Sequence, residues 1–532
     1  MIKSLKCCLL ILVVAAAALV LRVPRLKQRP MHGDEAVHAD KFGRLLERGE
    51  YRYNPNEYHG PTLNYFTLVP AWLTATDEYK DLTEFALRIV PVFFGILLVV
   101  LVLLLVDGLG GPAAVVAAIL IAISPAFVFY SRYYIQEMLL VCFAFGVIAS
   151  GYRYIKTRSI LWALLTGIFS GLCHATKETC IITFGSILLA LMLTLLVQRR
   201  RQGTGFDVKR IVKPWHLVAA AAAAIIISAL FYSSFLKNVG GIPDSVRSYA
   251  AYFNRASQSK LHIHPWYYYL RMLIYSKYAS GPFWSEALIV ILAVTGFVVA
   301  MTRKGIASVD FGLLTFVAFY ALIMTVVYSA IPYKTPWCLL GFLHGMILLA
   351  GVGAVAVTRL APNVLPRFIV VCLLVGGSVH LVLQAYVGSY KFYADSRNPY
   401  VYAHPVDDIV HIAQRVEQIA QLHPDGYKVH IDVICPGYDY WPLPWYLRSF
   451  SNVGWWTEVD ENAPPAPIII ASPSVEAALA KKLEKAKIPY VPLFNLYKEL
   501  RPQVELRGYI TKDLWESYQQ HQVQRILSQT SR

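Results

Sequence analysis

The sequence predicts a polytopic α-helical membrane protein of about 11 transmembrane helices, followed by a C-terminal extracytoplasmic α/β domain. The first observation is compositional: 56% of the 532 residues are hydrophobic and only 15% are charged, whereas soluble proteins carry about 25% charged residues. The second is that long apolar runs recur along the chain, each near the length that crosses a bilayer. We therefore expect a transmembrane domain at 1–387 and a separate domain at 388–532.

The net charge of +16 raises the question of a nucleic-acid partner. The distribution of the charges argues against one. Residues 388–532 carry 15 Lys and Arg against 16 Asp and Glu, so the first 387 residues carry 34 basic against 17 acidic residues. The excess therefore belongs to the membrane part, where basic loop residues set the orientation of the spans.

The N-terminal segment MIKSLKCCLLILVVAAAALVLRV has two interpretations. Its basic start, apolar core and alanines resemble a signal peptide. The alternative is an uncleaved first transmembrane helix. We favour the helix, because Arg22, Arg25 and Lys27 follow it directly and no small-residue cleavage site precedes a polar domain.

The apolar runs predict eleven spans. They lie at about 7–23, 86–106, 113–130, 135–153, 159–174, 179–197, 216–235, 285–301, 309–329, 337–357 and 367–387. Residues 61–75 are apolar but short, and we expect them to form an interfacial helix on the membrane.

The loops between the spans predict the orientation. With a cytoplasmic N-terminus, the cytoplasmic side receives YRYIKTRS, QRRRQGTGFDVKR, TRKG and TRLAPNVLPR, which are the most basic loops. The outer side then receives a long first loop at 24–85, the loops at 131–134, 175–178, 236–284 and 330–336, and the tail.

The tail reads as a small α/β domain. Residues 406–421 and VEAALAKKLEKAKI have the periodicity of amphipathic helices, and YKVHIDVIC and APIIIAS are typical of strands. Its aromatic segment YDYWPLPWYLRSF and Trp455–Trp456 would either stack on sugars or pack the tail onto the membrane or its own core. We favour packing.

This topology gathers unusual polar residues on one face. They are the acidic pair Asp34 and Glu35, the Tyr58–His59–Gly60–Pro61 segment, and the loops SRYYIQEM (131–138), HATKE (174–178) and IPYKTPW (331–337). Ionisable groups near membrane depth are costly and point to function. Convergence of five clusters on one face therefore predicts a site there.

Asp34 has two compatible interpretations. It would cap a helix over residues 35–48, whose apolar residues have helical periodicity. A carboxylate in a sheltered cleft could also act as general base toward a hydroxyl acceptor. For Glu35, the alternatives are a catalytic role, exposure to water, or a pair with a loop arginine.

A divalent cation is a further hypothesis. His32, Asp34, His38 and His59 supply imidazole and carboxylate ligands that suit such ions. Their spacing matches no strong metal motif, and the sequence contains no CxxC, so no cofactor is assigned.

Three cations and two carboxylates extend the predicted site. Arg132, Lys177 and Lys334 would suit an anionic group such as a phosphate, although interfacial anchoring is the alternative, above all for Lys334 beside Tyr333. Glu137 and Glu178 lie near span ends and need partners, for which Arg132 and Lys177 are the candidates. Glu137 could instead orient the acceptor or bind a metal.

The motifs in this order resemble a known class. An acidic pair in the first outer loop, a His-x-Pro near the end of that loop and a polytopic core resemble the GT-C glycosyltransferases. More narrowly they resemble the family 39-like proteins, relatives of protein O-mannosyltransferases and of the aminoarabinose transferase of lipid A. The stretches MHGDEAVHA, EYHGPTLNYF, SRYYIQEMLL and WPLPWYLR look most like the subgroup of flippase-activity-associated proteins.

The resemblance implies a function. Members of this class transfer a sugar from a polyprenyl phosphate outside the membrane, with inversion. Asp34 matches the acidic residue that serves as catalytic base, and Glu137 falls where relatives have a second acidic residue, often Asp.

The resemblance also implies roles for the binding residues. His59 and Gly60 stand where relatives have His-Pro-Pro or Lys-Pro-Pro, so Gly60 replaces a proline. Lys177 and Lys334 resemble the basic residues that face the donor phosphate. The acceptor would be a lipid, a glycan or a protein, the other partners would be membrane lipids, and the location would be a prokaryotic plasma (inner) membrane.

Two other functions compete with this one. A lipid-linked sugar translocator without chemistry would show inverted repeats and helices broken near the midplane, which the sequence lacks. A polysaccharide assembly scaffold would use the tail to bind partners. The sequence contains no P-loop, no GxGxxG after a strand and no DxD in the outer loops, so no motif indicates a nucleotide site.

Overall fold

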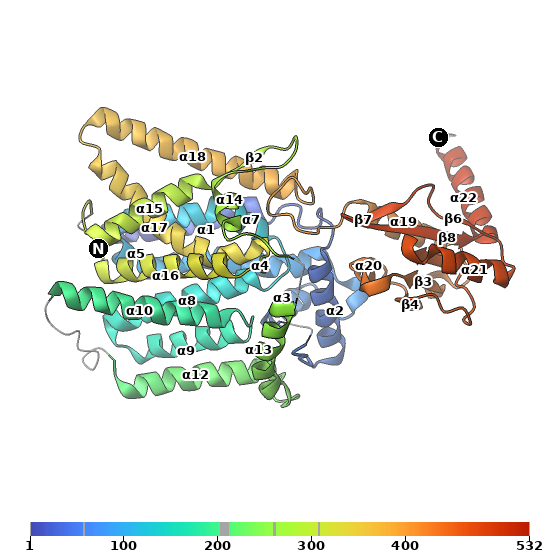
Figure 1. The fold of residues 1–532 in the computed structure, drawn as a ribbon, viewed down its shortest axis with the longest axis horizontal. Coiled ribbons are helices and arrows are strands. Elements are labelled where there is room, and N and C mark those ends of the chain that lie inside the picture. The colour runs from blue at the N-terminus through green and yellow to red at the C-terminus, as the bar shows by residue number, and fades with distance from the viewer. Residues whose placement is uncertain (1, 57–58, 203–211, 259–261, 307–308, 531–532) are drawn as a thin grey trace.

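The computed structural model describes residues 2–56, 59–202, 212–258, 262–306 and 309–530. An elongated bundle of helices makes up most of the chain, and a smaller sheet-containing part lies beyond one end of it (Figure 1). The N-terminus lies at the opposite end of the bundle. We call the end that faces the sheet the tail-side end.

Within the described residues, eight helical stretches are long and apolar enough to cross a membrane. They are α1 (Ile2–Arg22), the run of α4 (Glu84–Leu101), η2 (Val102–Leu105) and α5 (Val106–Leu109), α8 (Glu137–Thr157), α10 (Cys180–Gln202), α12 (Pro214–Tyr232), α16 (Phe311–Ala330), η3 (Pro336–Leu339) with α17 (Leu340–Leu360), and α18 (Val364–Tyr390).

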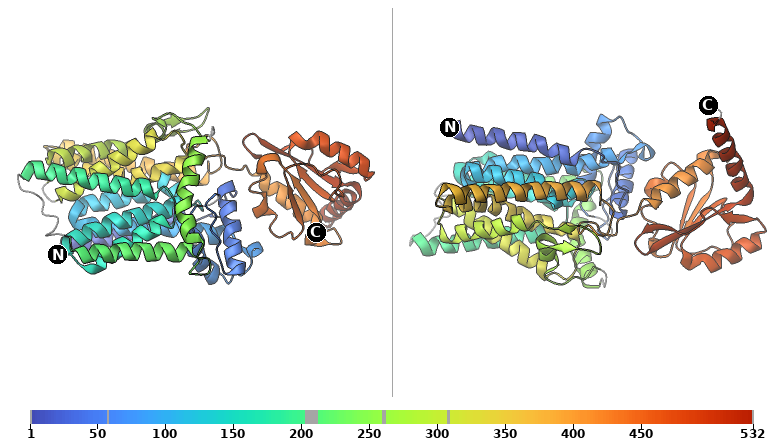
Figure 2. Two further views of the ribbon diagram at one scale, coloured as in Figure 1. Left: turned by 60° about the horizontal axis from the view of Figure 1, so that its bottom comes forward. Right: turned by 90° about the horizontal axis from the view of Figure 1, so that it is seen from above.

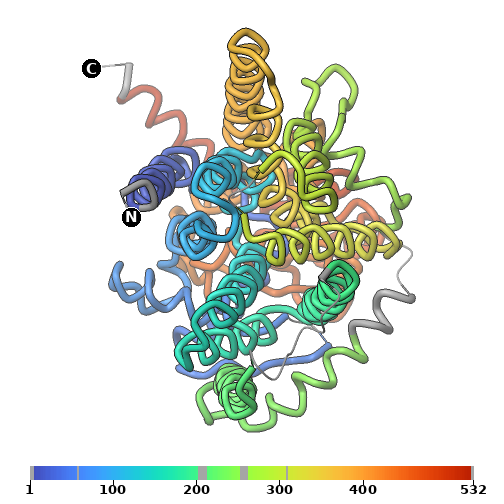
Figure 3. The backbone as a smooth tube through the Cα atoms, turned by 90° about the vertical axis from the view of Figure 1, so that its left-hand side faces the viewer, coloured from blue at the N-terminus to red at the C-terminus, as the bar shows by residue number. Residues whose placement is uncertain are grey.

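Three more elements complete the predicted set of spans. The helices α6 (Gly111–Ile123) and α7 (Pro125–Ser131) form one span bent by 56°. Two shorter apolar helices are α9 (Ile160–His174) and α15 (Ala287–Thr302). Each of the eleven predicted spans thus has an apolar helix, and the fold prediction of a polytopic helical protein is confirmed. Figure 3 shows the helices end on.

The bend between α6 and α7 has a local cause. Pro125 begins α7 and cannot donate to the preceding turn, and the Ser124 hydroxyl accepts from the Phe127 N–H at 3.5 Å. The buried Glu286 carboxylate accepts from the Ser124 hydroxyl at 2.5 Å and from the Ala126 N–H at 3.0 Å. Backbone groups freed by the bend are thereby satisfied.

Short elements cover the tail-side end of the bundle. They are α2 (Gly33–Arg48), α3 (Thr62–Leu73), η1 (Tyr79–Asp81), α13 (Gly241–Gln258), α14 (Tyr268–Ile274), β1 (Ser276–Lys277) and β2 (Phe283–Trp284). The helix expected over 61–75 is present as α3, and α13 lies across the ends of the spans (Figure 2). Tyr58 and residues 203–210 of one basic loop, both named above, lie outside the described residues.

The tail is built on one mixed sheet. Its strands are β3 (Ile431–Ile434), β4 (Val453–Trp456), β5 (Ile468–Ala471), β6 (Tyr490–Pro492), β7 (Lys498–Arg501) and β8 (Val504–Thr511). The order is β4-β3-β5-β8-β6, with β7 also on β8; β3 pairs in parallel with β4 and β5, and the pairs with β8 are antiparallel.

Helices cover both faces of this sheet. They are α19 (Asp408–Ala420), α21 (Glu476–Ala486) and α22 (Lys512–Thr530), with the short η4 (Gly426–Lys428), η5 (Pro436–Tyr438), α20 (Leu443–Tyr446) and η6 (Pro473–Val475) in the connections. Both β3 and β5 are buried on both faces. Accordingly β5 is a continuous apolar run, and β3 is apolar except for the buried Asp432, which accepts from the Trp456 indole N–H at 2.8 Å. The two helices and two strands expected in the tail are present. The division of the chain between 387 and 388 stays a prediction.

The tail contacts the tail-side end of the bundle through its aromatic segment. Trp445 is fully buried and donates its indole N–H to Glu84 at 2.9 Å. The Tyr446 hydroxyl accepts from the Met31 N–H at 2.9 Å, and Arg448 donates to the Leu82 carbonyl at 2.8 Å. Within the tail, the Tyr440 and Trp455 rings lie 4.9 Å apart. This segment therefore packs the tail, as we favoured.

Candidate active site

The start of α2 sets the directions of the acidic pair. His32 is the N-cap: its Nδ1 accepts from the Asp34 N–H at 3.0 Å, and the Glu35 Oε2 accepts from the His32 N–H at 3.0 Å. This is a capping box with histidine in the usual place of Ser or Thr. The expectation that Asp34 caps the helix is wrong, because Asp34 lies in the first turn and His32 takes the cap.

Glu35 points into the protein and is fully buried. It accepts from Arg29 at 2.8 Å, from Arg88 at 2.9 and 2.7 Å, and from the Tyr134 N–H at 2.8 Å. Burial alone would raise the pKa of this carboxyl, but the two guanidinium charges and the hydrogen bonds lower it to about 2. Glu35 does not face water; it pairs with the loop residue Arg29 and with Arg88 of α4.

Asp34 points the other way, with 51% of its side chain exposed. Its charge acts on the pKa of four ring groups, which are His32, His38, Tyr133 and His262. His38, one turn further along α2, is buried, and burial lowers its pKa to about 3. The charges of His59 and Lys177 add to this effect, and that of Asp34 opposes it. Asp34 is thus an accessible carboxylate beside the loops that carry His59 and Lys177.

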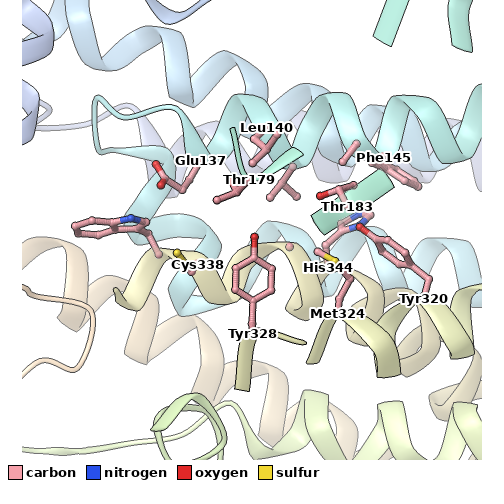
Figure 4. A pocket seen from close by; sticks show the side chains of 14 residues that line it. Glu137, Leu140, Phe145, Thr179, Thr183, Tyr320, Met324, Tyr328, Cys338 and His344 are labelled. Carbon is pink, nitrogen blue, oxygen red and sulfur yellow. The ribbon is translucent and has the colours of Figure 1, made fainter. Parts of the chain in front are cut away.

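A cleft runs from this region into the bundle between α8, α10, α16 and α17. Its lining is Glu137, Leu140, Val141, Ala144, Phe145, Thr179, Thr183, Tyr320, Met324, Tyr328, Trp337, Cys338, Gly341 and His344. Figure 4 shows Glu137 at one end of this row and Tyr320 and His344 toward the other, with the Tyr328 hydroxyl pointing into the space between. The cleft is therefore charged at its tail-side end and mainly apolar deeper in.

Glu137 and Lys177 form the charged end of the cleft. Both side chains are buried, and the Lys177 ammonium donates to Glu137. Lys177, proposed from sequence as a partner of Glu137, is therefore the partner that the structure brings to it. Gln136, next to Glu137, contacts His38 at 3.3 Å and so joins this pair to the helix of Asp34.

The second part of the first loop packs on the 174–178 loop. His59 Nδ1 lies 2.7 Å from Glu178 Oε2, and the Tyr53 hydroxyl donates to the other carboxylate oxygen at 3.1 Å. Burial would raise the pKa of Glu178, but the adjacent His59 lowers it below its ordinary value. Glu178 thus pairs with His59, which the sequence analysis did not propose, and the charge of Lys177 also acts on this carboxylate.

Gly60 is explained by this packing. A Cβ at Gly60 would lie 2.2 Å from the Ala175 carbonyl oxygen, closer than any side chain allows. Thr62 then donates its N–H to the same carbonyl at 3.2 Å. Where relatives have a proline, this chain uses glycine to bring the two loops into direct backbone contact.

Lys334 and Tyr333 reach the site through a paired segment. Ile263 and Tyr333 form an antiparallel bridge, and the His262 carbonyl accepts from the Lys334 N–H at 2.9 Å. The His262 ring lies 5.3 Å from that of Tyr333. The Lys334 ammonium is buried and donates to the Ile331 carbonyl, and burial lowers its pKa.

Arg132 lies elsewhere and does not line the cleft. Its guanidinium donates to the carbonyls of Arg22 and Pro24 at 2.7 and 2.8 Å and stacks 4.4 Å from the Tyr390 ring. It holds the C-terminal end of α1 against α18. The expectation that Arg132 joins Lys177 and Lys334 at one phosphate is therefore wrong in its geometry.

The metal hypothesis fits the geometry poorly. Both ring nitrogens of His32 have partners, the Asp34 N–H and the Tyr402 carbonyl at 2.9 Å. In the part of the chain that the structure describes, no three His, Cys, Asp or Glu side chains are placed to hold a metal ion.

Sequence reasoning missed several residues of this region. His262 lies in the 236–284 loop without a motif, and Arg88 lies within an apolar span. An arginine inside a span was a signal that could have been followed, because such a charge needs a partner. Nothing local marks His262.

Comparisons with known proteins bear on the class of the protein. Residues 56–238 match the family model of dolichyl-phosphate-mannose-protein mannosyltransferases. The fold is similar over 93% of this chain and 97% of the other to the crystal structure of ArnT from Cupriavidus metallidurans in the apo state, with 16% identity and a TM-score of 0.62. No curated protein matches the chain in sequence.

Two further solved structures are similar. ArnT from Cupriavidus metallidurans bound to undecaprenyl phosphate matches with 17% identity, the same coverage of 93% and 97%, and a TM-score of 0.61. The S. cerevisiae protein O-mannosyltransferase Pmt1-Pmt2 complex bound to the sugar donor matches with 18% identity over 44% of this chain and 34% of that one, with a TM-score of 0.34.

The family match and the fold define the class. The chain is a multi-pass membrane protein with the GT-C fold, and its predicted class, glycosyltransferase, is confirmed. The resemblance to the flippase-activity-associated subgroup stays a prediction.

Proposed function

We propose that the protein transfers a sugar from a polyprenyl-phosphate donor to a hydroxyl acceptor, with inversion, and that Asp34 is the general base. The observation that carries this proposal is the split of the acidic pair: Glu35 is buried and saturated with hydrogen bonds, whereas the Asp34 side chain is half-exposed. The tail-side end would then be the extracytoplasmic face of a plasma membrane.

The cleft suits the donor. Its deeper lining is mainly apolar, as an isoprenoid chain requires, and its tail-side end carries Lys177. The relative ArnT binds undecaprenyl phosphate. Lys177 and Lys334 would neutralise the charge on the departing phosphate, because cations placed where charge develops lower the barrier. Lys177 would then divide its hydrogen bonds between Glu137 and the phosphate.

The reaction balances without a cofactor. The acceptor oxygen forms a bond to the anomeric carbon as the bond from that carbon to the phosphate oxygen breaks, and the electron pair stays on the polyprenyl phosphate. Asp34 removes the hydroxyl proton from the opposite side of the sugar. The products are a glycoside and a polyprenyl monophosphate, so the anomeric configuration inverts.

The remaining predicted residues take supporting roles. Glu35 was expected to be catalytic; its contacts instead suit a positioning residue that fixes the start of α2. Glu137 would orient Lys177 or the acceptor. His59 and Glu178 hold the first loop on the 174–178 loop, and Tyr333 would border the donor phosphate.

Transfer of label from defined lipid donors tests the proposal. Purified wild type, Asp34→Asn and the matched control Asp40→Asn receive radiolabelled polyprenyl-phosphate sugars and a membrane extract that supplies lipid, glycan and protein acceptors. Asp40 lies on the same helix and pairs with Arg44 at 2.9 Å. We expect transfer by wild type and by Asp40→Asn, and none by Asp34→Asn.

The opposite result has a defined meaning. If wild type releases sugar from none of the donors but moves labelled lipid across reconstituted vesicles, the translocator is the correct function. If Asp34→Asn transfers label at the wild-type rate, the enzyme class stands but Asp34 is not the base.

A further inference from the structure

Four arginines are buried close together near the tail-side end of the bundle. Arg22, Arg29, Arg88 and Arg132 are each at most 7% exposed. Glu35 is the carboxylate paired with them in the described residues, through Arg29 and Arg88. Four guanidinium charges against one carboxylate leave a formal charge of +3.

Backbone carbonyls hold the unpaired guanidinium groups. Arg22 donates to the Ala122 and Ile121 carbonyls at 2.7 and 3.0 Å, and Arg132 donates to carbonyls at the end of α1. Carbonyls at helix C-termini carry partial negative charge and offset part of this excess. They do not supply whole counter-charges, and burial accordingly lowers the pKa of Arg29 and of Arg132 to about 10.

A pocket lies against this charge. It is lined by Leu26, Arg29, Arg88, Phe129, Arg132, Ser389 and Tyr393. It shares no residue with the cleft described above.

One hydroxyl group in this pocket lacks a hydrogen-bond partner among the described residues. Ser389 is 6% exposed, and its Oγ has no hydrogen-bond partner among the described residues. A buried polar group without a partner is costly, and a bound ligand or an ordered water would satisfy it. The Tyr393 hydroxyl, also in the lining, donates to Asp407 at 3.4 Å.

We propose that this pocket binds a phosphate group, at a site separate from the donor cleft. Arg29, Arg88 and Arg132 would supply the charge and Ser389 a hydrogen bond.

The phosphate would come from an anionic lipid headgroup or from solution. Of the lining residues, Leu26 follows α1 and Ser389 lies in the last turn of α18. The apolar stretches of these two helices are only 22% and 17% buried, and both helices lie on the outside of the bundle (Figure 3). Leu19 and Val20 of α1 and Leu383 of α18 are exposed near that end, where acyl chains could lie along them.

Thermal unfolding of the purified full chain in detergent tests the site. One arm adds inorganic phosphate against chloride at equal ionic strength, and the other adds dioleoyl-phosphatidylglycerol against dioleoyl-phosphatidylcholine. We expect at least one addition to raise the Tm of wild type by about 2 °C or more. A rise with phosphatidylglycerol alone identifies a lipid headgroup, a rise with phosphate alone a soluble anion, and both a site open to either.

Substitutions at Ser389 test whether the rise in Tm comes from binding in this pocket. Ser389→Asp supplies a tethered carboxylate, so its Tm should rise without additive and respond no further. Ser389→Asn has nearly the same shape without the charge; its Tm should not rise, and its response should weaken. Ser378→Ala, on the same helix with its hydroxyl bonded to the Leu374 carbonyl, should respond like wild type. Lys334→Gln should also keep the response, which separates this site from the donor cleft.

Two results would overturn the proposal. One is a wild type whose Tm responds to neither phosphate nor phosphatidylglycerol. The other is a response that both Ser389→Asp and Ser389→Asn retain at full size.

Discussion

The two carboxylates at the N-terminus of α2, Glu35 and Asp34, lie in opposite environments. On one side, Glu35 is buried and accepts from Arg29, Arg88 and two backbone N–H groups. On the other, the Asp34 side chain is half-exposed. The difference indicates that Glu35 stabilises the fold, which leaves Asp34 available for chemistry.

Asp34→Asn should have the largest effect. Loss of a general base lowers kcat by about 10²–10⁴-fold, whereas the fold should persist because the N-cap of α2 is His32. Initial rates of sugar transfer together with the Tm of the same preparation measure both effects. A much lower Tm for this variant than for wild type would show that Asp34 stabilises the fold, as Glu35 does.

Glu35→Gln should act mainly on stability. It leaves two buried guanidinium groups without their carboxylate, and breaking a buried ion pair costs about 3–5 kcal/mol. Thermal unfolding monitored by size-exclusion chromatography reports the loss. Asp40→Asn is the control on the same helix, and an unchanged Tm for Glu35→Gln would refute the structural role.

Gly60→Ala should damage both stability and transfer. The added methyl group meets the Ala175 carbonyl at 2.2 Å, so the loops that carry His59 and Lys177 must separate. Overpacking of this kind costs about 1–3 kcal/mol. The matched control is Gly151→Ala, where an added Cβ meets nothing within 4 Å. Equal Tm and kcat/KM for the two variants would contradict the close packing.

Lys334→Gln should weaken donor binding. Loss of one charge-assisted contact to the phosphate should raise the KM for the lipid donor about tenfold. Lys277→Gln, an exposed lysine of β1, serves as the control. A lower kcat with an unchanged KM would instead show that Lys334 acts only in the transition state.

The pH dependence of stability should be the smallest effect. The pKa of Glu35 is lowered to about 2 in the folded state, against about 4.3 when unfolded. Its contribution to stability is therefore complete above the unfolded value and is lost as the pH falls through the folded one. The Tm difference between wild type and Glu35→Gln should be constant from pH 7 down to about 5 and shrink below it. A difference that already shrinks between pH 7 and 6 would mean that the carboxyl is not held by Arg29 and Arg88.

The spans were predictable because a bilayer imposes length and apolarity on each helix. Strands β4, β6, β7 and β8 of the tail escaped prediction, since alternating or short segments on a partly exposed sheet carry weak patterns.

Within the site, the sequence indicated the acidic pair but not the division of labour within it. Adjacent helical residues point in directions about 100° apart, and which direction is buried depends on Arg88, 53 residues further along the chain. His32 was overlooked as a cap because histidine is rarely considered for that position.

The most direct test of the account compares Asp34→Asn and Glu35→Gln in one assay. The rate of label transfer from a polyprenyl-phosphate sugar is divided by the amount of folded protein, and the Tm is measured in parallel. The account predicts a folded but inactive Asp34→Asn and a destabilised Glu35→Gln whose folded fraction still transfers sugar. An inactive folded fraction of Glu35→Gln beside an active Asp34→Asn would contradict it and assign the base to Glu35.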